Sequence, residues 1–167
     1  MAGAAAGATG ATGATSAAAA AAAAATAEQG LTRLCAFFET LTPTRLEGLV
    51  AVYAEAARFR DPFNDVRGLA GIRRIFDDMF ERTRAPRFVI TARVLQGQQA
   101  FVSWDFHFQL GQRALCIPGC SQLLFDAHGR VSDHRDYWDA AGELYVHLPW
   151  VGGLMRWLKR KLSAHGG

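Results

Sequence analysis

One carboxylate, that of Asp61, lies in a sequence context that could make it a general base. In the stretch RFRDPFNDVRG, Asp61 precedes a proline and lies between two bulky apolar residues, Phe59 and Phe63. A carboxylate held in apolar surroundings can act as a general base near neutral pH. Asp61 could equally brace the turn before the next helix, or pair with Arg58 or Arg60. The sequence leaves both roles open.

A second polar set follows in the stretch SDHRDYWD. Alternation along a strand places His134, Asp136 and Trp138 on one face. Together with Asp61, His134 and Asp136 could supply one base and one acid, for proton abstraction beside a carbonyl or for water activation. His134 could instead be a structural histidine paired with Asp136 or Asp61. The catalytic hypothesis requires Asp61 and His134 to face each other across an enclosed apolar hollow.

Helical periodicity surrounds Asp61 on both sides. A first helix is expected from about residue 26, because Thr26 and Gln29 have the spacing of a capping box and apolar residues then recur at helical intervals. A second helix is expected over 42–57 and a third over 69–83. The inner face of the second helix is expected to contain Leu46, Leu49, Val50 and Tyr53.

After Pro86 the apolar pattern changes to the alternation of strands. Four strands are expected, over 87–96, 100–110, 114–126 and 130–139. Three early helices followed by a run of antiparallel strands predict an α+β fold, with the helices packed on one face of a curved, mostly antiparallel sheet. A ligand pocket between the helices and the sheet is the usual consequence.

The order of elements, the block YAEAARFRDPFNDVRGLAGIRRIF and the closing GRVSDHRDYWD resemble the nuclear-transport-factor-2-like superfamily over about residues 28–140. That resemblance implies the cone-shaped fold of ketosteroid isomerase and the SnoaL-like cyclases. It implies that Asp61 occupies the position of the isomerases' general base. Phe37 and Ser121 fall near the isomerases' oxyanion-binding tyrosine and aspartic acid, and a phenylalanine cannot donate a hydrogen bond. The resemblance to the SnoaL-like cyclases, which use an Asp and a His, is therefore the better one.

The resemblance and the residues together give two function hypotheses. The first is an isomerase, cyclase or hydrolase that acts on a hydrophobic carbonyl-containing ligand, with Asp61 as base and His134 and Asp136 in support. The second is a non-catalytic module of the same fold that binds a ligand or a partner protein. The residues expected to contact the ligand are Phe37, Tyr53, Phe63, Ser121 and Trp138. No cofactor motif is present in the sequence, and no cofactor is predicted.

The two ends of the chain differ from its centre in composition. Residues 1–25, rich in Ala, Gly and Thr, are expected to be a disordered or weakly helical leader before a domain over 26–142. Residues 143–167 predict a basic amphipathic helix, too short and charged to cross a bilayer. Such a helix could cover the mouth of the cone, pack in a homodimer or touch a membrane surface.

The net charge of the whole chain, +3, gives little support to nucleic-acid binding.

Two possible metal ligands lie on the strand expected over 100–110. Asp105 and His107 share the face opposite the apolar stripe of Val102, Trp104, Phe106 and Phe108, and with a further ligand they could bind a metal. Because no spacing motif accompanies them, a solvated or dimer-facing surface is favoured and no metal site is predicted.

Cys35, Cys116 and Cys120 form an odd set without CxxC spacing, which favours reduced thiols in a structural role and a cytoplasmic location.

Overall fold

The computed structural model describes residues 10–140, with side chains from residue 16 onward. Helix α1 (Gly10–Glu39) leads into a 3₁₀ helix, η1 (Pro43–Gly48), and a single helical turn, α2 (Leu49–Val52). Strands β1 (Tyr53–Arg60) and β2 (Asp65–Arg67) precede helix α3 (Leu69–Arg82). Four long strands follow: β3 (Arg84–Gln96), β4 (Gln99–Leu110), β5 (Arg113–Phe125) and β6 (Val131–Trp138). The predicted helix over 143–167 lies outside the described residues.

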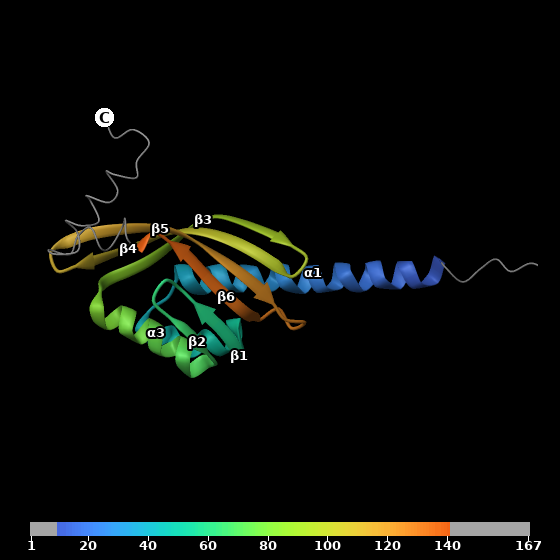
Figure 1. The fold of residues 1–167 in the computed structure, drawn as a ribbon, viewed down its shortest axis with the longest axis horizontal. Helices are drawn as coiled ribbons and strands as arrows, with labels where there is room; N and C mark the ends of the chain where they lie inside the picture. Colours follow the sequence, from blue (N-terminus) through green and yellow to red (C-terminus); the bar gives the residue numbers. More distant parts are fainter. Residues whose placement is uncertain (1–9, 141–167) are drawn as a thin grey trace, which may run out of the picture.

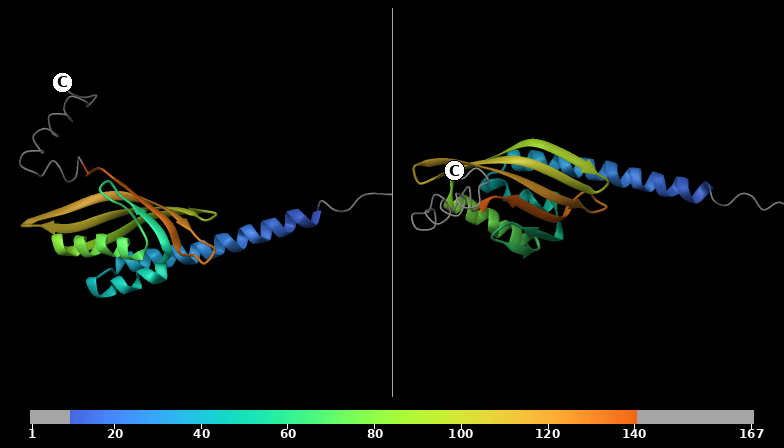
Figure 2. Two further views of the ribbon diagram at one scale, coloured as in Figure 1. Left: turned by 60° about the horizontal axis from the view of Figure 1, so that its bottom comes forward. Right: turned by 45° about the horizontal axis from the view of Figure 1, so that its top comes forward.

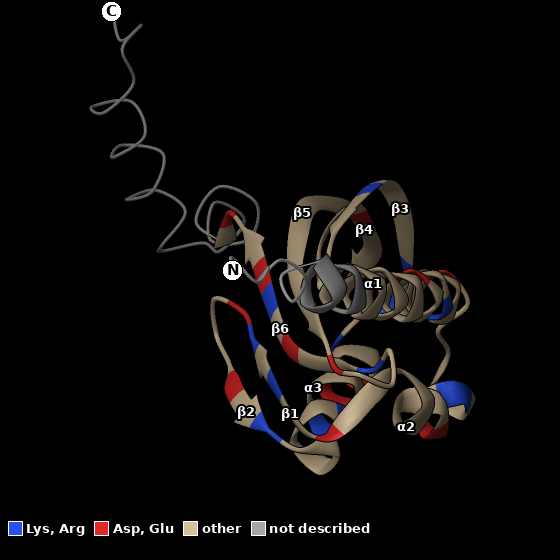
Figure 3. Ribbon diagram, turned by 90° about the vertical axis from the view of Figure 1, so that its right-hand side faces the viewer, with Lys and Arg blue, Asp and Glu red and all other residues tan. Residues whose placement is uncertain are grey.

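The strands form one curved sheet in the order β2-β1-β6-β5-β4-β3, with the helices against its concave face (Figure 1). Strand β1 runs parallel to β6, and the other neighbouring strands run antiparallel. The sheet is therefore mixed, and the α+β prediction is confirmed. Figure 3 looks along α1 and shows it enclosed by β3, β4 and β5 on one side and β6 on the other.

Helix α1 begins well before the predicted start. It includes residues 10–25, where alanine has the highest helix propensity. Thr26 does not cap the helix, because its hydroxyl donates to the carbonyl of Ala22 at 3.0 Å within the helix. The buried stripe starts at Ala27 and continues through Leu31, Leu34 and Phe38. The first half of α1 consequently projects beyond the sheet (Figure 2).

Gly30 fixes how closely α1 approaches the turn between β5 and β6. A Cβ added there would overlap the backbone carbonyl of Gly129. Helix propensity alone would make Gly30→Ala stabilising by about 1 kcal/mol, but overpacking of this kind costs about 1–3 kcal/mol. We expect a net loss of stability, measured as a lower urea midpoint. Gln29→Ala, at an exposed neighbouring position, is the control and should change little.

The second predicted helix is wrong beyond Val52, because Tyr53–Arg60 form strand β1. Residues 58–60 pair with both β6 and β2, and Tyr53 pairs with Val131 of β6. The strand buries Ala57 and Phe59, which overrides the helix propensity of YAEAA. Tyr53 is fully buried as expected, but Val50 is 62% exposed. This change of element turns Tyr53 toward the last strand.

The third helix and the four predicted strands are confirmed to within a few residues. The apolar stripe of α3 packs Ile72 and Phe76 into the core, and the stripe of β4 packs Val102, Trp104 and Phe108 there. Within residues 10–140, no helix is long and apolar enough to span a membrane.

Candidate functional site

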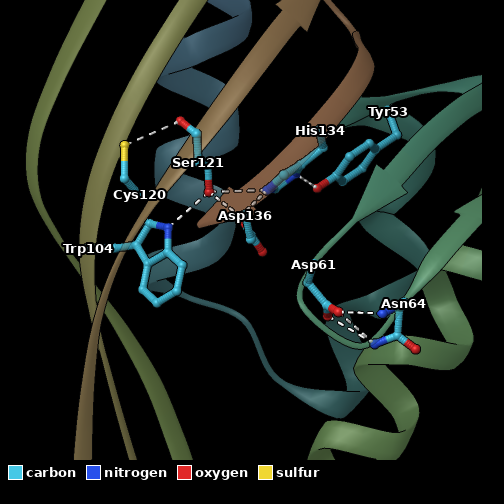
Figure 4. Close-up of polar contacts among 8 residues, drawn as sticks. All are labelled: Tyr53, Asp61, Asn64, Trp104, Cys120, Ser121, His134 and Asp136. Atoms are coloured by element: carbon cyan, nitrogen blue, oxygen red, sulfur yellow. Dashed lines mark hydrogen bonds and ion pairs between the residues drawn. The ribbon is translucent and has the colours of Figure 1, made fainter. Parts of the chain in front are cut away.

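A buried chain of hydrogen bonds links β1, β4, β5 and β6 at the centre of the sheet. The hydroxyl of Tyr53 lies 2.5 Å from Nδ1 of His134, and Nε2 of His134 lies 2.7 Å from Oδ1 of Asp136. Ser121 donates to the same Oδ1 at 2.5 Å, and Nε1 of Trp104 donates to the Ser121 oxygen at 2.9 Å. Figure 4 shows these side chains converging on Asp136.

The direction of each hydrogen bond follows from the donors present. The Trp104 indole can only donate, so the Ser121 hydroxyl accepts from it and donates to Asp136. With Asp136 ionised, His134 donates from Nε2, and Nδ1 accepts the Tyr53 proton. The hydrogen bonds therefore run from Trp104 through Ser121, and from Tyr53 through His134, to one carboxylate. Among the described residues both of its hydrogen bonds reach Oδ1, so Oδ2 is the oxygen available to a substrate.

Tyr53 is held as a neutral phenol. Burial raises its pKa well above the ordinary value of 10.0, and the charge of Asp136 raises it further. The phenol therefore keeps donating to His134 throughout the neutral range. Since the folded-state pKa lies above the unfolded one, the stability linked to this group is present below pH 10.0 and is lost as the pH rises from there toward the raised pKa.

An alkaline titration followed by phenolate absorbance tests this assignment. We expect one tyrosine of the wild-type protein to resist titration until the chain unfolds, and Tyr53→Phe to abolish that delayed step. The variant should also lose about 1–3 kcal/mol at neutral pH, because Nδ1 of buried His134 is left without its donor. Titration curves that differ only in amplitude, with no delayed step in either protein, would contradict the buried hydrogen bond.

The hydrogen-bonded chain borders a small apolar cavity. Its volume is about 30 Å³, which has room for one or two water molecules. Ser121, His134 and Asp136 supply its polar wall. Five aromatic side chains supply most of the remainder: Phe38, Phe59, Phe76, Phe88 and Trp104. In this conformation the cavity does not admit the ring-like substrate that the sequence suggested.

An open groove of about 550 Å³ lies on the outer side of Asp136. Asp61 and Pro62 line it, together with the last four residues of β6, Arg135 to Trp138, and Asp139 after them. Phe63 packs edge-on against Trp138, with 5.3 Å between ring centroids, and is itself 49% exposed. Asp136 is 15% exposed and lines both the cavity and the groove, so it stands between them.

Asp61 does not join the His134 and Asp136 pair. Its Oδ1 accepts the backbone N–H groups of Phe63 at 2.7 Å and Asn64 at 2.6 Å, and the Asn64 side-chain amide contacts both carboxylate oxygens. Figure 4 shows Asp61 turned toward Asn64 and away from Asp136. The geometry is that of a turn-forming aspartate. Asp61 and His134 therefore do not face each other across the cavity.

The two arginines beside Asp61 have other partners. Arg58 pairs with Asp65 through Nε at 2.8 Å, and this hydrogen bond holds the pKa of Asp65 below its ordinary value. Arg60 contacts Asp133 at 3.0 Å across the parallel strands. The alternative in which Asp61 pairs with Arg58 or Arg60 is thus not the arrangement observed.

The five residues that the sequence predicted to contact a ligand lie in three separate places. Tyr53 and Ser121 lie in the hydrogen-bonded chain, Trp138 lines the groove, and Phe63 packs against Trp138. Phe37 is half-buried, packs on Phe38 at 5.7 Å between centroids, and does not line the cavity. Sequence reasoning assigned Trp104 to the sheet core and missed its polar contact with Ser121.

The comparisons with known proteins agree with this architecture. The profile of the SnoaL-like domain matches residues 34–134, and the chain belongs to that family. None of the curated proteins compared with the chain matches it significantly.

Three solved structures illustrate the shared fold. A protein of ketosteroid isomerase-like fold from Catenulispora acidiphila, in complex with trimethylamine, is 13% identical with a TM-score of 0.60, over 69% of this chain and 88% of that one. A protein assigned to the SnoaL-like polyketide cyclases, from Jannaschia sp. CCS1, is 12% identical with a TM-score of 0.62, over 72% and 90%. An LEH-like epoxide hydrolase from M. tuberculosis is 18% identical with a TM-score of 0.59, over 81% and 93%. At these identities the likeness shows the fold alone.

Proposed function

We propose that this protein is an acid–base enzyme of the SnoaL-like family that acts on a hydrophobic small molecule, with Asp136 as the proton-transferring carboxylate. The observation that carries the proposal is the hydrogen bond of 2.7 Å between His134 and Asp136, buried between an apolar cavity and an open groove. His134, whose Nδ1 accepts from Tyr53, donates from Nε2 to the carboxylate and orients it. Oδ2 of Asp136 is the oxygen that accepts the proton.

This assignment moves the base from Asp61 to Asp136. Asp61 uses its carboxylate to form the turn between β1 and β2, since it accepts two backbone N–H groups there. It contributes to the groove as a wall and not as a proton acceptor. Phe63 and Trp138 supply an apolar surface beside it, on which the hydrophobic part of a ligand can lie.

The size of the cavity favours water activation over isomerisation of a multi-ring substrate. About 30 Å³ beside Ser121, His134 and Asp136 is too little space for such a substrate, so the ligand occupies the groove, which Asp136 also lines. There Oδ2 of Asp136 would take a proton from a water molecule beside the ligand, and the water oxygen would bond to an electrophilic carbon as the C–O bond of an epoxide or the C=O π bond of a carbonyl breaks. The proton then passes from Asp136 to the alkoxide that this step leaves. Solved proteins of this fold bear the names of polyketide cyclases and an epoxide hydrolase, which is consistent with chemistry of this kind.

Isotope labelling tests the proposal. Small molecules that co-purify with the protein are identified by mass spectrometry. These compounds, and a panel of hydrophobic epoxides and activated carbonyl compounds, are then incubated with the protein in H₂¹⁸O. We expect enzyme-dependent ¹⁸O incorporation into at least one product. Compounds that bind the groove without any conversion above the buffer rate would count against an enzyme.

A second candidate is a non-catalytic module that binds a hydrophobic ligand or a partner protein. One observation favours it: five aromatic side chains almost fill the space beside the polar wall. In that case the chain from Tyr53 to Asp136 serves stability and conformational specificity. A homodimer, a cytoplasmic location, membrane contact by residues 143–167 and independence from cofactors all stay predictions.

A further inference from the structure

The outer face of the sheet brings together three side chains that bind metals in other proteins. Asp105 and His107 lie two residues apart on β4, on the face opposite Trp104, and His107 is paired directly with Cys116 of β5 in the antiparallel register. Sγ of Cys116 lies 3.9 Å from Nε2 of His107. One ligand atom from each of the three residues lies within 4.8 Å of the others.

We propose that Asp105, His107 and Cys116 form a binding site for a divalent transition-metal ion of the zinc class. Thiolate, imidazole and carboxylate are the protein ligands of zinc, at about 2.3, 2.0 and 2.1 Å. A tetrahedral arrangement at those lengths places neighbouring ligand atoms roughly 3.5 Å apart. The ligand atoms now lie within 4.8 Å of one another, so side-chain rotations have to bring them closer by at most about 1.3 Å for this arrangement to form. Mg²⁺ and Ca²⁺, which take oxygen ligands, do not fit a set with one sulfur and one nitrogen.

The surrounding structure suits a metal that exchanges with solvent. Two paired strands supply all three side chains, so their backbone positions are fixed by the ladder between β4 and β5. Asp105 and His107 are half-buried and Cys116 is exposed, so an ion can enter from the outer face. Three protein ligands leave a fourth tetrahedral position for water. The site lies on the opposite face of β4 from the cavity and is independent of the proposed function.

Titration of the full-length protein with Co²⁺ under a non-chelating reductant tests the site, because tetrahedral Co²⁺ reports a thiolate ligand by a charge-transfer absorption band. We expect one Co²⁺ per chain with that band, and its displacement by Zn²⁺. Cys116→Ser should abolish the band. Since loss of an outer-shell contact typically weakens binding 10–100-fold, loss of this direct ligand should weaken it by about 100-fold or more.

Matched variants separate this site from other ligands of the chain. Cys120→Ser changes the nearest other cysteine on β5 and should keep both the band and the affinity. His107→Gln and Asp105→Asn should each weaken binding while the protein stays folded. Three results would overturn the proposal: no thiolate band with Co²⁺, a band that survives Cys116→Ser, or equal loss in the Cys116 and Cys120 variants.

Discussion

Replacing Asp136 with asparagine is expected to lower kcat/KM by about 10²–10⁴, the range that general acid–base groups contribute. Asparagine keeps the shape of the side chain and can still accept hydrogen bonds from Ser121 and His134, but it cannot take a proton from water or from a substrate. The loss should appear in kcat, because the groove that binds the ligand is unchanged. Steady-state kinetics on the compound identified by isotope labelling measures it.

Asp133→Asn is the matched control for this experiment. Asp133 lies on the same strand, and its carboxylate pairs with Arg60 at partial exposure. Surface ion pairs contribute about 0–1 kcal/mol, so this variant should keep both its activity and its Tm within a few degrees. If Asp136→Asn loses activity only in proportion to a lowered Tm, Asp136 is structural and the proposed role is wrong.

Replacing Phe59 with alanine is expected to cost about 3–5 kcal/mol of unfolding free energy and to enlarge the cavity. Phe59 is 3% exposed, and its ring centroid lies 4.6 Å from that of His134. Removing the ring leaves a void beside the polar wall that the rigid strands cannot close completely. Urea denaturation with and without a benzene-sized ligand measures both effects. Binding in the void should restore about 2.7 kcal/mol at a ligand concentration 100 times Kd.

The control for this prediction is Phe63→Ala. Phe63 is 49% exposed, so the same truncation should cost less than about 1 kcal/mol and create no ligand-dependent gain in stability. Phe59→Leu, which removes less volume, provides a second variant if Phe59→Ala does not fold. Equal losses at positions 59 and 63, or no ligand-dependent recovery in either Phe59 variant, would contradict the account of the cavity.

The sequence alone correctly predicted the helix and the strands whose pattern of apolar residues is unbroken. Helix α3 has apolar residues at helical spacing from Leu69 to Phe80, and strands β3 to β6 alternate between clear turns. The order of these elements also identified the family, because a long ordered pattern constrains the fold more than any short motif. The pairing of His134 with Asp136 was among the alternatives, since both lie on one face of β6.

The failures have specific physical causes. Tyr53 was assigned to a helix because it continues the helical spacing of Leu46, Leu49 and Val50. In the structure Tyr53 pairs with Val131 of β6, and residues 58–60, which follow YAEAA, pair with both β6 and β2.

For Asp61 the sequence left two roles open, a base in an apolar hollow or a brace for the turn, and the two flanking phenylalanines suggested the hollow. A backbone that turns immediately after Pro62 offers N–H groups to the carboxylate, and local hydrogen bonds of this kind are common for aspartate in turns.

Which side chains meet across neighbouring strands depends on the register, that is, on which residues of the two strands lie opposite each other. The turn at Gly111 and Gln112 pairs Leu110 with Arg113, and this register places Val102 opposite Ser121 and His107 opposite Cys116. Gly-Gln is a weak hairpin signal compared with Asn-Gly, so the register was not read from the sequence. For the same reason the polar contact of Trp104, and Cys116 as the third side chain beside Asp105 and His107, were missed.

We propose that Asp136, and not Asp61, is the carboxylate that transfers the proton. The most direct test compares kcat/KM of Asp61→Asn and Asp136→Asn on one substrate at one pH, with the unfolding free energy of both variants measured in parallel. We predict that Asp136→Asn is slower than Asp61→Asn by a factor of about 100 or more. We predict that Asp61→Asn loses mainly stability, because its turn loses charge-assisted hydrogen bonds. The opposite order, with Asp61→Asn inactive but fully stable and Asp136→Asn active, would contradict the account.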